Sequence, residues 1–480
     1  ADFASHKFPP KPTDIEKTGK RIAIIGSGPS GLAAAHDLAI YGHTVVIYEA
    51  LPVAGGMLSV GIPPYRLPRE KIEDTVAWVK SFGVELHLNT AIDSPKTFNG
   101  LLRANDAVYI AAGAHKSQLL EIPGEELPGV LHGVAFMRDT NLGTLTTVPE
   151  KVVVIGGGFT AIDCARSSLR LGAREVSIVY RRTLEEMPAG EIEVRMAEEE
   201  GIKMHYLTSP VRILAGRDQK VAQIECLKNT LGEPDNKGRR RPIPVNGSNF
   251  TIPAGMIIAA IGQSPHLPFL SHTLGIEVNR LGMPLVNQEN FMTTKPGVFA
   301  GGDCITGPRN VIEVIADGRK AARSIHAFLT GQEKNGYRFF YKEQAPSGRA
   351  TDYEIIPRQH ADVCAIMEKP CLNTETEPGL SRENALKEAS RCLLCHYNIF
   401  IDETCVLCGG CIDVCPNNCI SMASKDQIEV ANASSGDAVA FGDWDAAMVL
   451  NEEKCIRCGL CVKRCPVGAI TMKRFSYTMD

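Results

Sequence analysis

The sequence has few of the features that mark secreted, membrane-spanning or nucleic-acid-binding proteins. No apolar run in its 480 residues is long enough to cross a bilayer. Its first 21 residues lack the basic-then-apolar order of a secretory signal. The formal net charge is −4, which gives no reason to expect nucleic acid or an anionic membrane as a partner. We therefore expect a cytoplasmic, globular, multidomain protein without a nucleic-acid or membrane partner.

Cysteine is scarce over most of the chain. Only Cys164, Cys226 and Cys304 precede residue 360, and residues 20–330 contain no CxxC pair. This argues against a dithiol reductase and suggests that Cys164 and Cys304 are packing residues. Of the 16 cysteines, 11 lie between Cys392 and Cys465, mostly at two-residue spacings. Such repeats in a large chain without a secretory signal indicate metal binding rather than a disulfide scaffold.

Residues 21–330 alternate between short β-rich runs and helical stretches. The runs RIAIIG, TVVIYEA, AVYIAAG, KVVVIGGG, EVSIVYRR and MIIAAIG are apolar, β-branched and of strand length. The alternation predicts an α/β architecture with parallel sheets. Several runs end in glycine, as AVYIAAG does at Gly113, where a strand turns sharply into a helix or a cofactor loop. Residues 331–390 are polar and read as a linker, with a helix expected from 381 to 396 after an N-cap at Ser381.

A first dinucleotide site follows the strand at residue 21. Gly26, Gly28 and Gly31 form a GxGxxG loop that opens a helix, allowing a tight turn, close approach to a pyrophosphate and close packing of helix on strand. The helix N-terminus offers free N–H groups to the phosphates. The next strand ends at Glu49, whose carboxylate can accept hydrogen bonds from both ribose hydroxyls.

A second dinucleotide site lies in the middle of the chain. Gly156 and Gly158 follow a strand, and Ala161 takes the third glycine position. The next strand ends in Arg181 and Arg182 instead of an acid, and guanidinium groups bind a 2′-phosphate that a carboxylate repels. One such bond is worth about 1.5–3 kcal/mol, so NADP(H) is favoured over NAD(H). The alternative is that the two arginines form a solvated surface pair.

Two nucleotide sites on one chain fit a flavoprotein. Residues 297–304, GVFAGGDC, supply a further strand, a glycine pair ending at Gly302, and Asp303. A carboxylate at a strand's carboxyl end beside two glycines suits a hydroxyl-rich ligand such as the ribityl chain of FAD. By itself the segment would be a turn, but after two fingerprints we favour the ligand interpretation.

The carboxyl-terminal module carries a two-part cysteine repeat. Both halves have the spacing CxxCxxCxxxCP, which is the bacterial two-cluster ferredoxin pattern, in which the fourth cysteine crosses to the other cluster. The first predicted [4Fe–4S] set is Cys405, Cys408, Cys411 and Cys465, and the second is Cys455, Cys458, Cys461 and Cys415. Zinc is the alternative metal, although closed zinc sites use separate CxxC pairs. A third cluster on Cys392 and Cys395 stays open.

Residues 20–330 resemble the flavoprotein small subunit of bacterial glutamate synthase and the matching part of dihydropyrimidine dehydrogenase. The motifs that carry the resemblance are GSGPSGLAAA, YEALPVAGGM, GIPPYRLP, VIGGGFTAIDCAR, VYRRTLEEMP and VFAGGDC. The resemblance implies that Gly56 and Met57 join Gly26, Gly28, Gly31 and Glu49 at FAD, and that Asp303 binds the ribityl chain. It implies NADPH at Gly156, Gly158, Arg181 and Arg182. The chain departs from the family at Phe159, where asparagine is usual, and in placing its cysteine-rich module after the flavin domain.

These observations predict a domain plan. An amino-terminal extension covers 1–20, an FAD-binding domain covers 21–145 and 280–330, and an NAD(P)H-binding domain covers 146–279. The linker is 331–390, and a small α+β ferredoxin-like domain with two [4Fe–4S] clusters covers 391–480. The two nucleotide-binding domains are expected to be Rossmann-like, as in disulfide-reductase-type flavoproteins.

The predicted function is electron transfer between NADPH, FAD and the clusters, with another redox protein or catalytic subunit completing a hetero-oligomer. Hydride transfer mainly requires positioning, so no catalytic acid–base pair is predicted. Two alternatives remain. One is a stand-alone NAD(P)H:ferredoxin oxidoreductase, or the NADPH half of an electron-bifurcating complex. The other is a structural electron-wiring subunit without nucleotide turnover.

Overall fold

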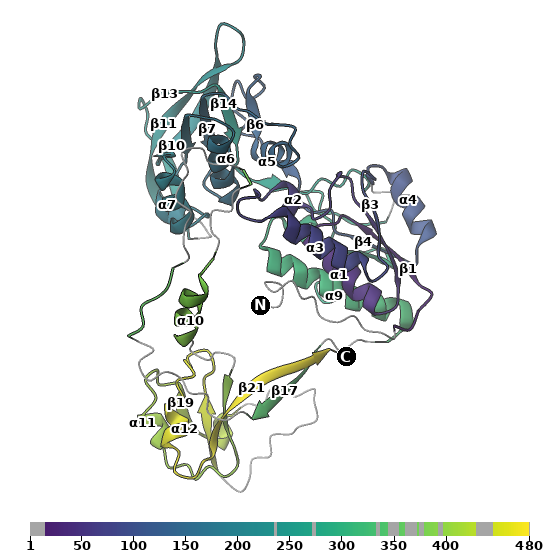
Figure 1. The fold of residues 1–480 in the computed structure, drawn as a ribbon, viewed down its shortest axis with the longest axis vertical. Helices are drawn as coiled ribbons and strands as arrows, with labels where there is room; N and C mark the ends of the chain where they lie inside the picture. Colours follow the sequence, from purple (N-terminus) through teal and green to yellow (C-terminus); the bar gives the residue numbers. More distant parts are fainter. Residues whose placement is uncertain are drawn as a thin grey trace. The chain divides into compact units, whose positions relative to one another are not determined.

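The chain forms two compact units in the computed structural model (Figure 1). The structure describes residues 15–234, 238–270, 275–332, 337–343, 355–360, 372–373, 379–391, 397–428 and 445–479. The first unit comprises Ala1–Lys334 with Val363–Glu377, and the second comprises Asn335–Asp362 with Pro378–Asp480. None of the helices within the described ranges is both long and apolar enough to span a membrane.

The first unit contains a parallel five-stranded sheet in the order β16-β4-β1-β2-β3. Its strands are β1 (Arg21–Ile25), β2 (Thr44–Tyr48), β3 (Glu85–His87), β4 (Ala107–Ile110) and β16 (Val298–Ala300). The β1 and β4 side chains are almost entirely buried, as expected for a sheet covered on both faces. Its helices are α1 (Pro29–Ile40), α2 (Met57–Val60), α3 (Arg69–Lys80), α4 (Pro95–Ala104), α8 (Asp303–Thr306) and α9 (Val311–Thr330).

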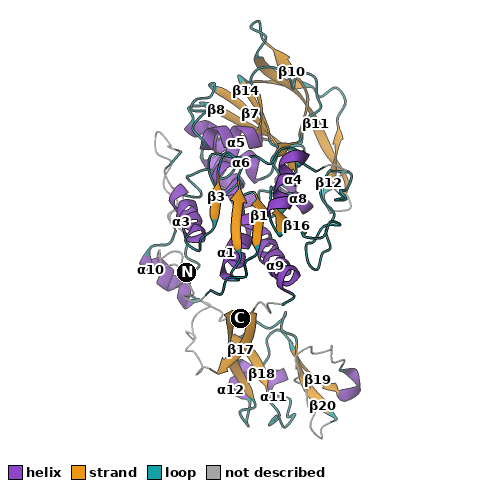
Figure 2. Cartoon of the chain, turned by 90° about the vertical axis from the view of Figure 1, so that its right-hand side faces the viewer, coloured by secondary structure: helices purple, strands orange, loops and turns teal. Residues whose placement is uncertain are grey.

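A second parallel sheet has the order β6-β14-β7-β8-β9 (Figure 2). Its strands are β6 (Val130–His132), β7 (Lys151–Ile155), β8 (Glu175–Val179), β9 (Lys203–His205) and β14 (Met256–Ala259). Its helices are α5 (Gly133–Asn141), α6 (Phe159–Arg170) and α7 (Glu191–Glu199), with a 3₁₀ turn at Leu184–Glu186. β6 belongs to this sheet although it precedes the predicted boundary at residue 146.

An antiparallel extension is attached to the second sheet. It pairs β11 (Val221–Pro234) with β10 (Thr208–Ala215), β12 (Arg240–Pro244) and β13 (Phe250–Pro253). A separate two-stranded ladder joins β5 (Lys116–Ser117) to β15 (Gln263–Ser264). The six apolar runs identified in the sequence form β1, β2, β4, β7, β8 and β14, so the predicted parallel α/β architecture is confirmed.

The second unit is a small α+β module. Its sheets are β17-β21-β18 and β19-β20, both antiparallel. The strands are β17 (Tyr337–Glu343), β18 (Tyr397–Ile401), β19 (Ile420–Ser424), β20 (Ala446–Leu450) and β21 (Ile470–Met479). The helices are α10 (Arg382–Ser390), α11 (Gly410–Asp413) and α12 (Leu460–Arg464), with a 3₁₀ turn at Lys425–Gln427. Ser381 caps α10 by accepting a hydrogen bond from Asn384 N–H at 3.1 Å.

Candidate functional site

The carboxyl ends of β1, β2, β4 and β16 surround a cavity of about 480 Å³. Its volume lies in the range of about 300–1,000 Å³ that is usual for small-molecule and cofactor sites. All of the predicted FAD contacts except Gly31 line it, namely Gly26, Gly28, Glu49, Gly56, Met57, Gly113, Gly302 and Asp303. The structure therefore brings together residues spread over nearly 280 positions of sequence, at the place where open α/β sheets bind ligands.

The glycine loop after β1 leaves room for a ligand at one position and none at two others. Gly26 has a φ of +102°, and a Cβ there would lie 2.5 Å from Ala111 O. A Cβ at Gly31 would lie 2.1 Å from Gly26 O, which accounts for its place in the helix–strand packing outside the cavity. A Cβ at Gly28 would meet nothing within 4 Å. Gly28 is the N-cap of α1 and no side chain caps the helix, so its first N–H groups face an open space that fits a pyrophosphate.

Glu49 is buried at the end of β2 and already has protein donors. Its Oε2 accepts hydrogen bonds from Ser27 N–H at 2.9 Å and from Ser27 Oγ at 2.6 Å, while Oε1 accepts from Leu51 N–H at 2.9 Å. A carboxylate has about four acceptor positions, so this anchored group retains capacity for a ribose hydroxyl. The ordering by Ser27 and Leu51 fits a residue that recognises a diol in a fixed orientation.

Asp303, which also lines the cavity, begins α8. Burial raises the pKa of its carboxyl group, and Arg309 N–H donates to its Oδ1 at 3.1 Å. Beside it, Gly302 N–H donates to Asp317 Oδ2 at 3.1 Å, and Arg309 pairs with the same Asp317 carboxylate. These contacts hold the turn after β16 in place. A half-buried carboxylate with a backbone N–H donor suits a hydroxylated chain.

Several cavity residues carried no sequence signal. His115, Arg138, Gln263, His266 and Phe269 line the cavity with the predicted contacts. Burial lowers the pKa of His115, which keeps its ring neutral. These residues come from segments without a recognisable motif, so only the three-dimensional structure groups them. Arg309 was detectable in principle, because it follows the GGDC motif by five positions.

The second glycine loop repeats the first one after β7. Gly156 has a φ of +144°, and a Cβ there would lie 2.2 Å from Ala260 O. Gly158 is the uncapped N-cap of α6, and a Cβ there would meet nothing within 4 Å. Ala161 is fully buried in the helix–sheet packing. Phe159, the residue at which the chain departs from the family pattern, is half exposed at the start of α6.

The two arginines after β8 have different surroundings. Arg181 is exposed, whereas Arg182 is 5 % exposed and donates from Nε to Arg240 O at 2.6 Å. Arg240 itself pairs with Glu185 and Glu186. Burial raises the pKa of Tyr180, and the positive charges of Arg182, Arg181 and Arg239 act in the opposite direction. Basic groups that follow β8 and that lie in the β11–β12 hairpin therefore meet here. The GRRRP run at 238–242 was not recognised in the sequence as part of this cluster.

The cysteine repeats of the second unit fold alike. Leu407, Gly409 and Asn418 have positive φ angles, and so do Arg457, Gly459 and Gly468, which lie fifty positions later in each case. Left-handed backbone at non-glycine residues costs about 1 kcal/mol or more and clusters at ligand clamps. Backbone N–H groups in both repeats donate to cysteine sulfur, from Cys419 to Cys415 at 3.3 Å and from Arg457 to Cys455 at 3.4 Å.

One cavity joins the two repeats. Cys415 of the first repeat lies in it with Cys455, Cys458 and Cys461 of the second, which is the set predicted for one cluster. Within the described residues, no three His, Cys, Asp or Glu side chains converge on a point that would hold a single ion. The four cysteines of the predicted set instead share the lining of one small cavity. Burial raises the pKa of Cys411, and the neighbouring Cys405 and Cys408 raise it further. Cys465 packs against the same apolar core as Cys411.

Cys419 is an additional thiol that the repeat pattern does not use. It is 5 % exposed, lines the same cavity, and its Sγ lies 3.1 Å from Sγ of Cys415. The cavity therefore presents five thiols where a cubane needs four. Cys392 and Cys395, considered for a third cluster, lie outside the described residues.

Cys164, Cys226 and Cys304, the described cysteines of the first unit, are buried free thiols. Burial raises the pKa of Cys226 and of Cys304 to about 12 and that of Cys164 well above its ordinary value. A thiol needs its thiolate form to react, so these side chains are inert packing groups.

Comparison with known proteins agrees with both units. The family of pyridine nucleotide-disulphide oxidoreductases matches residues 20–319, and the 4Fe-4S dicluster domain matches residues 404–469. Mycobacterium tuberculosis FprA in complex with NADPH shares the fold, with a TM-score of 0.55, 22 % identity and coverage of 65 % of this chain and 85 % of FprA.

Curated relatives cover more of the chain. NADP(+)-dependent formate dehydrogenase subunit beta of Moorella thermoacetica is 43 % identical over 395 residues, covering 80 % of this chain and 55 % of that protein. NADPH-Fe(3+) oxidoreductase subunit beta of Geobacter sulfurreducens is 36 % identical over 434 residues, covering 82 % and 63 %. Glutamate synthase [NADPH] small chain of Escherichia coli is 35 % identical over 334 residues, covering 67 % and 71 %. The chain thus spans less than two thirds of the first two relatives. It belongs to the pyridine nucleotide-disulphide oxidoreductase family and carries a 4Fe–4S dicluster domain after the flavoprotein-type fold.

Proposed function

We propose that the chain is the electron-input subunit of a larger NADPH-linked redox enzyme, with one FAD, one NADP(H) site and two [4Fe–4S] clusters. The observation that carries the proposal is that one chain combines the cavity at Gly28 and Glu49, a second open glycine loop at Gly158, and the five-thiol cavity at Cys415. Two of its relatives are named as beta subunits of NADP-linked oxidoreductases.

The chain's own residues supply binding and orientation. The N-terminus of α1 and Glu49 would hold the pyrophosphate and ribose of FAD, with Asp303 at the ribityl chain. The N-terminus of α6 would hold the second pyrophosphate, and Arg181 the 2′-phosphate. Bound FAD supplies the conversion between two-electron and one-electron transfer. The thiolates of the second unit would hold the one-electron carriers.

The assignment of NADP(H) depends on Arg181 more than on Arg182. Arg181 is exposed at the end of β8, where a 2′-phosphate would lie, while Arg182 is occupied with Arg240 O. We infer that Arg182 orders the β11–β12 hairpin beside the site. Glu185 and Glu186 both pair with Arg240, which offsets part of their negative charge beside the site.

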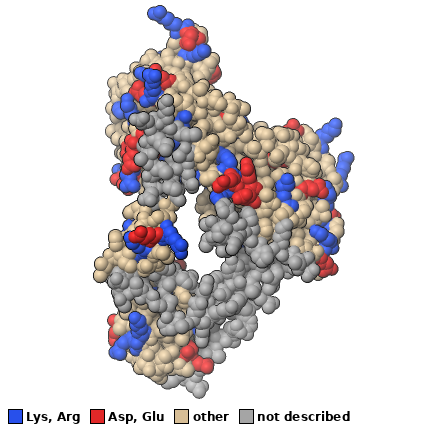
Figure 3. All heavy atoms as spheres, in the orientation of Figure 1, with Lys and Arg blue, Asp and Glu red and all other residues tan. Residues whose placement is uncertain are grey.

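We also propose that the chain works in the cytoplasm together with a redox partner. The described cysteines are all free thiols, as expected in a reducing compartment such as the cytoplasm. On the face drawn in Figure 3, acidic and basic side chains of the described residues are interspersed. A redox protein or a catalytic subunit fits this chain as partner, because the described site holds groups for nucleotide and electron transfer.

Anaerobic titration of the reconstituted chain tests the proposal. NADPH is expected to bleach the flavin absorbance, with NADH about ten- to a hundredfold less efficient, the ratio that one lost charge-assisted hydrogen bond produces. Equal efficiency of the two nucleotides would contradict the assignment of Arg181 to the 2′-phosphate. A flavin that neither nucleotide reduces would instead favour the structural electron-wiring subunit.

Copurification distinguishes the two enzymatic alternatives. Isolation from native cells under mild, anaerobic conditions is expected to yield the chain with a second redox subunit. A chain that purifies alone and reduces ferredoxin with NADPH would favour the stand-alone oxidoreductase. Copurification with a second flavoprotein would favour the bifurcating complex.

A further inference from the structure

The loop between α2 and α3, residues 61–68, faces two parts of the first unit. At its start, Ile62 lines the 480 Å³ cavity proposed to hold FAD, called the FAD cavity below, together with Met57 and Leu58 of α2. At its far end, Tyr65 and Arg66 lie against α6 and α7, the helices of the second sheet. Asn141 Nδ2 and Arg69 Nη2 both donate to Ile62 O, at 3.2 Å and 2.8 Å, which fixes the loop between these contacts.

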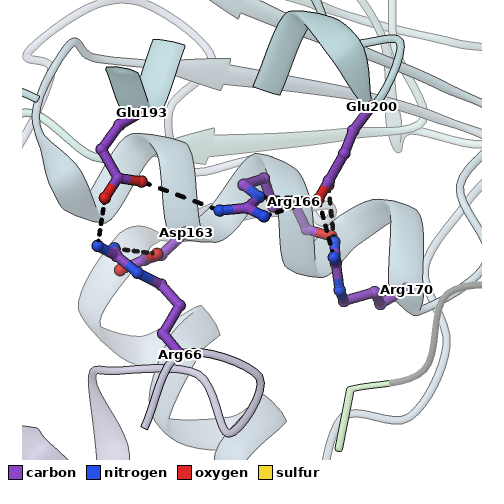
Figure 4. A network of polar contacts seen from close by, with 6 residues as sticks. All are labelled: Arg66, Asp163, Arg166, Arg170, Glu193 and Glu200. Atoms are coloured by element: carbon purple, nitrogen blue, oxygen red, sulfur yellow. Dashed lines mark hydrogen bonds and ion pairs between the residues drawn. The ribbon is translucent and has the colours of Figure 1, made fainter. Parts of the chain in front are cut away.

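Arg66 joins two helices through two carboxylates (Figure 4). Its Nη1 donates to Asp163 Oδ1 on α6 at 2.8 Å, and its Nη2 donates to Glu193 Oε1 on α7 at 2.6 Å. The Arg66 side chain is 21 % exposed and that of Asp163 is 7 % exposed. Ion pairs that are shielded from water in this way are screened little by salt.

Tyr65 extends the same contact into the core of α6. Its side chain is fully buried, and the guanidinium groups of Arg170 and Arg166 lie 4.1 Å and 5.2 Å from its ring centre. Both arginines bind Glu200, and Arg166 lies 3.9 Å from Glu193. The network thus contains three cationic and three anionic side chains, which are the six residues drawn in Figure 4. Every charge in it has an opposite charge beside it.

The contact lies next to the proposed nucleotide site. Asp163 is in the second turn of α6, whose N-cap is Gly158. Phe159, the first residue of that helix, has the Arg66 guanidinium 5.8 Å from its ring centre. One short loop therefore carries part of the FAD cavity wall at one end and holds the start of the nucleotide-binding helix at the other.

We propose that Arg66 is a positioning residue for electron transfer between nicotinamide and flavin. It fixes α6 relative to the wall of the FAD cavity, and thereby sets the placement of the bound dinucleotide. The inference rests on the proposed function. A misplacement of about 1 Å can cost about a hundredfold in rate without removing any reacting group. Loss of Arg66 is therefore expected to affect the reaction more than the binding of either nucleotide.

The test compares Arg66→Gln and Arg66→Lys with the wild-type holoprotein. Stopped-flow bleaching of the flavin over a range of NADPH concentrations gives the limiting rate and the dissociation constant. Long-wavelength charge-transfer absorbance reports the stacking of nicotinamide on flavin. For Arg66→Gln we expect the limiting rate to fall by about tenfold or more, with the dissociation constant changed less than threefold and the charge-transfer band weakened. Lysine can pair with one carboxylate, so Arg66→Lys should recover part of the rate.

The matched control is Arg195→Gln. Arg195 lies on α7, two positions after Glu193, but its side chain is 68 % exposed and pairs along its own helix with Glu199, so this variant should behave like the wild type. If Arg66→Gln prevents folding or FAD binding, Glu193→Gln removes one arm of the contact while leaving the pair with Asp163. It is expected to show a smaller loss of the same kind.

Two outcomes separate this inference from the proposed function. A wild-type flavin that NADPH does not reduce would overturn the proposed function and this inference with it. A wild-type flavin that is reduced, with an unchanged rate and charge-transfer band in Arg66→Gln and Glu193→Gln and only a lower melting temperature, would overturn the inference alone. In that case Arg66 would be a purely structural residue.

Discussion

Arg181 and Arg182 are adjacent, yet the end of β8 directs one to solvent and buries the other. The sequence predicted both as ligands of a 2′-phosphate. What it could not show is that Arg182 has a partner 58 positions away, the carbonyl oxygen of Arg240 on β12. The glycine positions were easier to foresee, because each is explained by contacts within its own strand–turn–helix segment or with the adjacent strand.

Substitution of these two arginines should therefore have different effects. Arg181→Gln is expected to lower kcat/KM for NADPH about ten- to a hundredfold and to change the value for NADH much less, because NADH has no 2′-phosphate for Arg181 to bind. Arg182→Gln should also lower the melting temperature, since the Arg182 side chain is buried and its Nε–H bond to Arg240 O is lost. Steady-state kinetics with both nucleotides and thermal unfolding provide the measurements. A greater loss of NADPH preference in Arg182→Gln than in Arg181→Gln would contradict this assignment.

A buried histidine pair makes stability depend on pH. His43 Nε2 lies 2.9 Å from His326 Nδ1, and burial, with a smaller contribution from His326, lowers the pKa of His43 from 6.5 to about 4. Below pH 6.5 the unfolded chain takes up a proton that the folded chain refuses, so stability falls as the pH decreases. At pH 5 the loss from this group is about 2 kcal/mol.

Denaturant unfolding of the wild type and His43→Gln between pH 7.5 and 5 measures this effect. The wild type should lose about 2 kcal/mol more than the variant over that range, because the variant lacks the titrating group. His115 and His205, whose pKa values are lowered by partial burial, titrate in both proteins and cancel in the difference. Parallel curves for the two proteins would show that His43 is not the group responsible.

The close packing of α1 against α9 depends on a glycine where the two helices meet. α1 and α9 lie side by side against the first sheet, and a Cβ at Gly318 of α9 would lie 2.2 Å from Ser30 O of α1 (Figures 1 and 2). Both helices border the FAD cavity, through Pro29 and Ser30 of α1 and through Val311 and Val314 of α9. The approach of these two helices therefore contributes to the shape of the cavity.

Gly318→Ala should destabilise the protein by about 1–3 kcal/mol and weaken FAD retention, because the added methyl group forces the helices apart. Gly100→Ala is the matched control. Gly100 also lies inside a helix, α4, but a Cβ there would meet nothing within 4 Å. This control should gain up to about 1 kcal/mol from the better helix propensity of alanine. Equal effects of the two substitutions on unfolding and on flavin content would refute the packing argument.

The cluster loops offer a second test at this scale. Cys415→Ala should remove about half of the iron, because Cys415 is the predicted crossover ligand of the second cluster. Cys419→Ala should retain the full iron content, since four thiols remain around that cavity. Iron and sulfide analysis with EPR spectroscopy of the reduced proteins would measure both. Loss of iron in Cys419→Ala together with retention in Cys415→Ala would identify Cys419 as the ligand.

Elements with strong local patterns were predicted, and those that depend on distant partners were not. The continuous apolar strands of the parallel sheets stand out in the sequence because both of their faces are buried. β6 is only three residues long, β10 and β11 mix buried, half-buried and exposed positions, and β12 has no buried position. β17 lies in a polar segment predicted as a linker and is a strand through its pairing with β21, more than 120 positions later.

At the scale of the whole molecule, the sequence indicates two chemistries on one chain. The first unit has the groups for two dinucleotides, and the second has the cysteines for one-electron carriers. The two family matches at residues 20–319 and 404–469 follow the same division. The cofactor-binding patterns could be recognised in the sequence because the residues of each pattern lie close together along the chain. The buried contact of Arg66 was not, because its two carboxylate partners lie 97 and 127 positions away.

The central claim is that electrons from NADPH reach the clusters only by way of the flavin. Rapid freeze-quench EPR after anaerobic mixing with NADPH tests it most directly, using FAD-replete and FAD-depleted samples of the same cluster-containing protein. The prediction is that reduced-cluster signals appear in the FAD-replete sample, after the flavin absorbance has bleached, and do not appear in the FAD-depleted sample. Cluster reduction at the same rate in both samples would contradict the account.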